Sequence, residues 1–383
     1  MKTVLISGAG VAGSALAHWL HRDGVAVTVV EHTPGRRRGG QAVDIRGTAL
    51  DVVERMGLLD RVRAHRTRMR GMSVLDGDGR EVHRSTEATF SSGRLASEDI
   101  ELLREDLVRV LHEQAGAGVE FVFDDRITAL DQDEDGGAED EDGGAGGGGG
   151  IRVTFERGRP RTFDLVVGAD GLHSAVRRLG FGPKERFTRH LGMHLAIFTA
   201  DNFLGLDDWQ LWLRDGEAGY GIYPVRDNTE LRISFGFAAG PLPAGPLDTA
   251  AHKRLVADRM AALRWETPRL LKALWEASDF YSDAMTQVHM DRWSHGRTVL
   301  LGDAGYCASP LSGQGTSLAL VGAHVLAAAL RGAGDDHRAA FARYEERMRP
   351  FVALNQALAV ENPGGPASEA SVDRAKRALA LED

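Results

Sequence analysis

The stretch VLISGAGVAGSALAHWLHRDGVAVTVVE, residues 4–31, contains two short apolar runs separated by a helical pattern. Apolar residues recur at helical spacing from Val11 to Leu20, and Gly24 is placed to end that helix. The two flanking runs are apolar on both faces, which is typical of strands in a buried parallel sheet. The stretch therefore predicts a βαβ unit and an α/β fold.

The turn between the first run and the helix has the spacing Gly8-x-Gly10-x-x-Gly13. Gly8 allows a tight turn, Gly10 lets backbone approach a pyrophosphate, and Gly13 lets the helix pack closely on the strand. Ala12 lies inside this turn and is included among the candidate cofactor-binding residues. Glu31 ends the next strand, where a carboxylate accepts hydrogen bonds from a ribose and repels a 2′-phosphate. The unit predicts a dinucleotide site that does not hold NADP.

A second turn rich in small residues follows an apolar strand in LLGDAGYCASPLSGQG, residues 300–315. A protein that binds only NAD does not need it, whereas FAD spans an adenosine, a pyrophosphate, a ribityl chain and a three-ring flavin. Asp303, at the end of that strand, is placed to accept hydrogen bonds from ribityl hydroxyls. The helix after Gly315 directs its positive N-terminus at the ligand, which suits the negative charge of a reduced flavin. The two turns together predict FAD.

The remaining segments predict two domains and a C-terminal helical region. Residues 1–179 and 291–335 supply a Rossmann-like FAD-binding domain. Residues 180–290 hold alternating and aromatic stretches separated by proline and glycine, which predict an inserted antiparallel β-sheet that binds the substrate. Residues 336–383 predict C-terminal helices. The tract at 131–150 has eight acids, nine glycines and no bases, so we expect a disordered loop.

Charge and cysteine content exclude several classes of protein. The 383 residues carry 46 bases and 55 acids, and much of the net charge of −9 comes from the acidic tract. No basic field for nucleic acid remains. The sequence contains no run of about eighteen apolar residues, so we expect no membrane span. The single cysteine, Cys307, excludes an internal disulfide. We expect a cytoplasmic protein that binds neither nucleic acid nor membrane.

Three motifs occur in order along the chain: GAGVAG with Glu31, GADGLHSAVR at 168–177 and LLGDAGYCASPLSGQGTSLAL at 300–320. They resemble the motifs of the class A flavoprotein monooxygenases, the single-component FAD-dependent aromatic hydroxylases. GGQAVDIRG at 39–47 and ELLREDL at 101–107 resemble stretches of the tetracycline-inactivating members. The resemblance covers most of the chain and implies the fold of p-hydroxybenzoate hydroxylase.

The resemblance implies roles for individual residues. Arg104 resembles the family arginine that contacts FAD, and Asp170 resembles the acid of a motif that serves FAD and nicotinamide binding. Asp303 resembles the ribityl-binding acid, and Arg46 matches a conformationally important region near the flavin. The segments expected to lie against the flavin ring are Pro310 and the backbone of 312–315, with Gly313, Gln314 and Gly315.

The resemblance also implies the reaction. In the family, NADPH or NADH reduces FAD, the reduced flavin reacts with O₂, and a C4a-hydroperoxyflavin transfers one oxygen atom to an electron-rich substrate. The flavin carries this chemistry, so we expect no catalytic triad and no metal site. The chain departs from the family at residues 306–310, YCASP, because many relatives have a histidine and two prolines there. This difference puts the contacts on the substrate side in doubt.

Aromatic residues and one methionine of the inserted domain are candidates for lining a flat, multi-ring substrate such as an aromatic polyketide. The alternative for each is that it belongs to the core of the sheet. The candidates are Trp209, Trp212, Tyr220, Tyr223, Phe235, Phe237 and Met285.

Three other functions are compatible with parts of the sequence. An FAD-dependent reductase or dehydrogenase without oxygen transfer has the same cofactor motifs. A flavin halogenase shares the fold, but WQLWLRD at residues 209–215 lacks the W-x-W-x-I-P pattern of that class. A non-catalytic FAD protein that docks a partner through the acidic tract is the third. Hydroxylation, epoxidation and Baeyer–Villiger insertion all stay open as the type of oxygen transfer.

Overall fold

The computed structural model describes residues 1–35, 39–132, 149–240, 248–362 and 365–382. Most of the acidic tract for which disorder is predicted, residues 133–148, lies outside the described residues. The two strands that border this tract, β10 and β11, pair antiparallel, so the tract connects neighbouring strands as the sequence predicts.

A six-stranded sheet forms the centre of the nucleotide-binding part, in the order β19-β20-β13-β1-β2-β9. All neighbouring strands are parallel except β19, which pairs antiparallel with β20. Parallel neighbours end at the same edge of the sheet, so the turns after β1, β13 and β20 lie side by side. The strands are β1 Thr3–Ser7, β2 Ala26–Glu31, β9 Glu120–Phe123, β13 Leu165–Gly168, β19 Ser294–His295 and β20 Thr298–Leu300.

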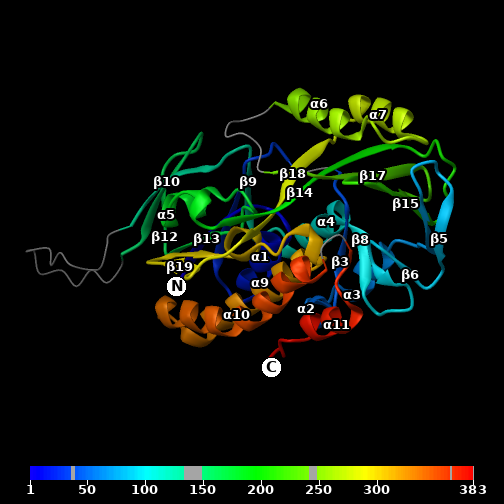
Figure 1. Ribbon diagram of the computed structural model, residues 1–383. Helices are drawn as coiled ribbons and strands as arrows, with labels where there is room; N and C mark the ends of the chain where they lie inside the picture. The colour runs from blue at the N-terminus through cyan, green and yellow to red at the C-terminus, as the bar shows by residue number, and fades with distance from the viewer. Residues whose placement is uncertain (36–38, 133–148, 241–247, 363–364, 383) are drawn as a thin grey trace, which may run out of the picture.

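Three long helices, α1 Val11–Arg22, α9 Gly315–Ala333 and α10 His337–Glu361, pack on one another beside this sheet (Figure 1). By length and composition α9 could cross a membrane, but 72% of its most apolar window is buried inside the protein. Burial in the core accounts for its apolar composition. Phe341 and Tyr344 of α10 belong to the same core as the sheet. The predicted C-terminal region therefore packs as part of the nucleotide-binding part.

The second sheet has seven strands in the order β18-β14-β17-β16-β15-β4-β5. Its apolar outer face is covered by α6 Thr249–Met260 and α7 Thr267–Glu276 (Figure 1). The last two strands of this order, β4 and the edge strand β5, come from residues 71–85, inside the segment assigned to the first domain, and β4 runs parallel to β15. The sheet is therefore mixed and extends beyond residues 180–290. The strands are β4 Gly71–Leu75, β5 Glu81–Ser85, β14 Thr188–Asp201, β15 Trp209–Asp215, β16 Ala218–Val225, β17 Glu230–Ala238 and β18 Tyr281–Val288.

Shorter elements connect the two sheets and border the turns. The strands among them are β3 Ala42–Ile45 paired with β8 Ile100–Leu103, β6 Ala88–Thr89 paired with β7 Gly93–Arg94, and the antiparallel set β10 Ile127–Asp131, β11 Ile151–Phe155 and β12 Arg161–Phe163. The helices are α2 Thr48–Arg55, α3 Leu59–Ala64, α4 Arg104–Ala115, α5 Ala175–Phe181, η1 Lys184–Arg186, α8 Asp303–Tyr306, η2 Pro310–Ser312 and α11 Glu369–Lys376.

Candidate cofactor and substrate site

The first glycine turn is a close-packed cradle between β1 and α1. A Cβ on Gly13 would lie 1.9 Å from the carbonyl oxygen of Gly8, and a Cβ on Gly8 would lie 2.5 Å from that of Ala169. Gly8 also has a φ of 105°, which L-residues rarely adopt. Gly10 caps α1, and a Cβ there would lie 3.5 Å from Nη2 of Arg104. The cradle therefore holds the N-terminus of α1 against the sheet with a guanidinium beside it.

Glu31 ends β2 with its carboxylate at the same turn. Its Oε2 accepts a hydrogen bond from the backbone N–H of Ala9 at 2.9 Å, and its Oε1 accepts from Thr33 N–H at 3.1 Å. Burial alone would raise the pKa of Glu31, but the hydrogen bonds from His32, Ala9 and Thr33 lower it to about 2. Glu31 is thus ionised at neutral pH and can accept from a ribose hydroxyl.

The second turn brings Asp303 to the N-terminus of α9. Gly302, with a φ of 64°, ends the segment after β20, and Asp303 then begins α8. Oδ1 of Asp303 lies 3.9 Å from the position of a Cβ on Gly315, the first residue of α9. A Cβ on Gly302 would lie 3.2 Å from Cβ of Ala12, so the two turns touch each other.

The side chain of Asp303 is exposed, although the surrounding protein raises the pKa of its carboxyl by desolvation. The neighbouring Cys307, Arg104 and Arg177 oppose this rise in pKa. Asp303 is therefore an accessible acceptor between two arginines and a helix N-terminus, as a hydroxyl-rich chain beside a phosphate requires. Cys307 is buried, as the sequence predicts for a small apolar residue beside this loop.

The loop before α9 lies against Arg46. Pro310 is exposed and begins η2, and Gly313 has a φ of 63°. A Cβ on Gly313 would lie 3.7 Å from Nη1 of Arg46, whose backbone N–H donates to Oγ of Ser317 at 3.0 Å. Gln314 is fully buried, and neither atom of its side-chain amide has a hydrogen-bond partner within the described part of the chain. Burying two polar atoms in this way costs folding free energy unless a bound molecule forms hydrogen bonds with them.

Asp170 lies beside the first turn but uses its carboxylate internally. Its Oδ2 accepts from the backbone N–H groups of Ala175 at 2.8 Å and Val176 at 3.2 Å, and Ser174 donates to its Oδ1. Burial raises the pKa of Asp170, against the effect of these hydrogen bonds. The carboxylate thus stabilises the start of α5.

The two faces of the second sheet separate the aromatic candidates. Tyr220, Phe235 and Phe237 belong to the core beneath α6 and α7, and Oη of Tyr220 lies 3.1 Å from Oγ1 of Thr267 at the start of α7. Tyr220 and Phe235 therefore do not face the nucleotide-binding part. Alternation along a strand shows which residues share a face, but it does not show which face the two helices cover.

The opposite face carries Trp212, Tyr223 and Met285. Met285 Sδ lies 3.9 Å from Oγ of Ser309 in the loop before α9. Oη of Tyr223 accepts from the backbone N–H of Ala42 at 2.9 Å, so Tyr223 is a buried link between the two parts. Trp212 packs edge-on against Phe90, with ring centroids 5.4 Å apart.

Trp209 lies apart from these residues. Its Nε1 donates to Oγ of Ser73 at 2.9 Å, and the guanidinium of Arg84 stacks on its ring. These contacts tie Trp209 to the edge of the second sheet.

Several polar residues at this junction have no role in the sequence-based predictions. Arg177 is buried and donates from Nη1 to the carbonyl of Ala304 at 2.7 Å, which ties the segment after β13 to the residue that follows Asp303. Asp44 accepts from Nη2 of Arg46 at 2.9 Å. Both residues belong to motifs of the sequence, Arg177 to 168–177 and Asp44 to 39–47. The partner of Arg177 is 127 positions away in the chain, whereas the partner of Asp44 is only two residues away.

Three comparisons with known proteins agree on the class. The model of the FAD binding domain family matches residues 1–357. An uncharacterized protein of Mycobacterium tuberculosis (strain H37Rv) is 50% identical over 385 residues, covering 100% of both chains. A flavin-dependent monooxygenase of Legionella longbeachae is 38% identical over 360 residues, covering 93% of this chain and 87% of the relative. The crystal structure of tetracycline destructase Tet(55) matches with a TM-score of 0.86 and 34% identity, covering 100% of this chain and 99% of that one.

The chain therefore belongs to the FAD binding domain family and, within it, to the class A flavin-dependent monooxygenases. It is an oxidoreductase whose cofactor is FAD. The residues described above fit that cofactor: a glycine cradle at a helix N-terminus, an ionised carboxylate at the adjacent strand end, and an exposed carboxylate where the second turn meets α9.

Proposed function

We propose that the protein uses NADPH or NADH and O₂ to insert one oxygen atom into an aromatic or polyketide-like small molecule. The observation that carries this proposal is the meeting of the turns after β1, β13 and β20 at one edge of the parallel sheet. Ligands of open α/β sheets bind at this edge. Bound FAD supplies the redox chemistry, from hydride acceptance to the delivery of one oxygen atom.

Each part of the site has a task toward the cofactor. The N-terminus of α1 binds the pyrophosphate through backbone N–H groups, because Gly8 and Gly13 keep side chains out of the way. Glu31 accepts from the adenosine ribose, and Asp303 accepts from the ribityl chain. Arg104, which lies beside Gly10 and acts electrostatically on Asp303, holds the centre of the cofactor.

The substrate meets the flavin from the second sheet. On the face toward the nucleotide-binding part, Gly221 pairs with Ser234 and Gly219 pairs with Gly236, so these two positions carry little side-chain bulk, next to the larger pair of Tyr223 and Arg232. Trp212 packs over Gly221 at one side of these small residues. A flat apolar molecule suits such a surface. Two solved structures that match this chain are named tetracycline destructases, so tetracyclines belong among the first compounds to test.

A labelling experiment tests the reaction. Purified protein with FAD and NADPH is incubated under ¹⁸O₂ with phenols, aromatic polyketides and tetracyclines, and products are identified by mass spectrometry. A product heavier by one labelled oxygen atom, together with substrate-stimulated NADPH oxidation, is the expected result. NADPH consumption with a hydrogenated product and no label would instead assign a reductase. The same assay run with NADH decides the preferred reductant.

The proposal also covers the cellular location and the binding partners of the enzyme. We propose a cytoplasmic enzyme whose partners are a small aromatic substrate, O₂ and a nicotinamide cofactor; the sequence has more acidic than basic residues, which does not favour nucleic acid as a partner. Fractionation of cells that express a tagged chain tests the location: recovery of the protein with the membrane pellet would contradict it.

A further inference from the structure

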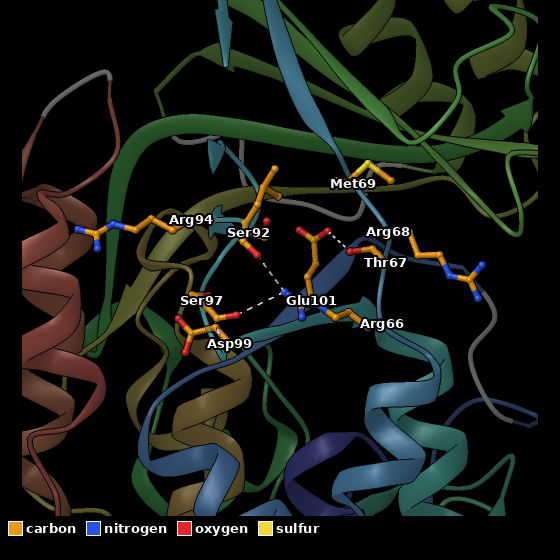
Figure 2. A pocket seen from close by; sticks show the side chains of 10 residues that line it. Arg66, Thr67, Arg68, Met69, Ser92, Arg94, Ser97, Asp99 and Glu101 are labelled. Carbon is orange, nitrogen blue, oxygen red and sulfur yellow. Dashed lines mark hydrogen bonds between the residues drawn. The ribbon is translucent and has the colours of Figure 1, made fainter. Parts of the chain in front are cut away.

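Two acidic residues occupy directly opposed positions in the small sheet of β3 and β8, and one of them, Glu101, lines the pocket of Figure 2. Asp44 on β3 and Glu101 on β8 are direct partners across antiparallel strands, and both are buried, with 9% and 3% exposure. Side chains at directly opposed positions start from Cβ atoms about 5 Å apart. Two carboxyl groups this close and this buried do not both ionise readily, because each negative charge disfavours the other.

The buried cations balance only one of the two carboxylates. Nη2 of Arg46 donates to Oδ2 of Asp44 at 2.9 Å, and both side chains are 9% exposed. Lys376 pairs with Asp99 at 3.0 Å, and Arg66 donates to backbone carbonyls of the neighbouring segment. The other charged or titratable groups near the pair are Glu105, Tyr223 and Arg232. Glu105 and Arg232 pair with each other at 3.1 Å. Among the described residues Glu101 forms no ion pair, so the guanidinium of Arg46 is shared by two buried carboxylates, and a proton on one of them would relieve their mutual repulsion.

We propose that Asp44 and Glu101 hold one proton between them and that the location of this proton sets the charge that Arg46 presents to the flavin. This role rests on the flavin site proposed above. With Asp44 ionised, Arg46 is neutralised by its own neighbour. When Asp44 is protonated, the positive charge of Arg46 is not balanced by this neighbour and is felt at the loop of Gly313. Nη1 of Arg46 lies 3.7 Å from the position of a Cβ on Gly313. Arg46 is then a positive charge beside the ring that becomes negative on reduction.

Unused hydrogen-bonding capacity supports this arrangement. In the described chain neither Oδ1 of Asp44 nor Nε of Arg46 has a hydrogen-bond partner, although both atoms are buried. Burial raises the pKa of Asp44 to about 7, against the attraction of Arg46, and Glu101 raises it further. Burial also raises the pKa of Glu101, opposed by hydrogen bonds from Ser91 and Thr67. The raised pKa of Asp44 thus lies near neutral pH.

A pocket gives the pair access to solvent protons. Glu101 lines a pocket of about 270 Å³ together with Thr67, whose Oγ1 donates to Oε1 of Glu101 at 2.7 Å. Figure 2 shows these two side chains directed at each other, while Arg68 and Arg94 extend away on either side. Because Glu101 lines this pocket, its carboxyl group can exchange a proton without any movement of β3 or β8.

A spectroscopic titration of the FAD-loaded protein tests the proposal. The absorbance of the bound flavin is followed across neutral pH for the natural protein and for Asp44→Asn, Glu101→Gln and the matched control Glu98→Gln, an exposed acid three residues away. We expect a one-proton transition near pH 7 that disappears in Asp44→Asn, moves to lower pH in Glu101→Gln, and is unchanged in Glu98→Gln. An unaltered transition in Asp44→Asn would overturn the proposal.

A second measurement does not depend on the flavin. At pH 7 we expect the infrared spectrum of the natural protein to contain the band of a protonated carboxyl group, and we expect this band to be missing from both Asp44→Asn and Glu101→Gln. If neither variant loses such a band, the pair holds no proton. A natural protein that shows the band but does not bind FAD would refute the cofactor site and leave the proton pair standing.

Discussion

Replacing Gly13 by alanine tests the geometry of the first turn most directly. The new Cβ would lie 1.9 Å from the carbonyl oxygen of Gly8 and 3.2 Å from Cγ2 of Ile6. Because the first of these atoms is backbone, no side-chain rotation relieves the contact, and α1 must move away from β1 by about 1 Å or more. Overpacking of this kind costs about 1–3 kcal/mol. We expect the upper end of that range, since the helix that moves also carries the pyrophosphate-binding N–H groups.

The assay combines urea unfolding with a titration of FAD by flavin fluorescence. Gly13→Ala should lower the free energy of unfolding by about 3 kcal/mol and weaken FAD binding at least tenfold. Gly180→Ala is the matched control: Gly180 lies in α5, and the nearest atom to its Cβ position is 3.9 Å away. That change should stabilise the protein by about 0.5–1 kcal/mol. If Gly13→Ala binds FAD like the natural protein, the cradle is not the pyrophosphate site.

Three further changes test other residues of the site. Asp303→Ala should lose bound FAD, seen as loss of the yellow colour after purification, whereas Asp291→Ala, at an exposed position, should keep it; a fully yellow Asp303→Ala protein contradicts the ribityl assignment. Tyr220→Phe removes the hydrogen bond to Thr267 and should cost about 1 kcal/mol of stability with no change in KM, since the residue lies beneath α7; a raised KM would place it in the substrate site after all. Glu31 has its pKa lowered from 4.5 to about 2, so its ionised form contributes stability above pH 4.5 that is lost as the pH falls toward 2. Glu31→Gln should therefore remove roughly 3 kcal/mol of stability at pH 7 and less at pH 3, measured by urea unfolding at both values; an equal loss at the two pH values would show that the charge of Glu31 is not what stabilises the fold.

Most of the nucleotide-binding part is predictable because its signals are local. The helix expected from Val11 onward is observed as α1, Val11–Arg22. The two glycine turns lie where expected, since a strand, a tight turn and a helix start need particular residues at fixed spacing. The second sheet was less predictable: β4 and β5 are far from β15 in sequence, and only tertiary pairing reveals that residues 71–85 belong with it.

The aromatic candidates show the same limit at the site. Tyr220 and Tyr223 lie three residues apart on β16, yet Tyr220 faces α7 and Tyr223 faces Ala42. The strand pattern separates these faces correctly but does not identify them. Asp44 and Glu101, 57 positions apart in the chain, could not be recognised as a pair until β3 and β8 were seen in register.

By itself the sequence determined the cofactor class, because GxGxxG with Glu31 and the Gly302–Asp303 turn specify backbone geometry within single short segments. Only the tertiary structure decided which side chains meet. It brought Asp303 close to the first residue of α9 and directed the carboxylate of Asp170 to the backbone of α5. It also placed two buried acids near one arginine. The physical reason is that these effects act over different separations along the chain. Turn chemistry acts between neighbours in the chain, whereas burial and charge depend on every segment that packs around a group.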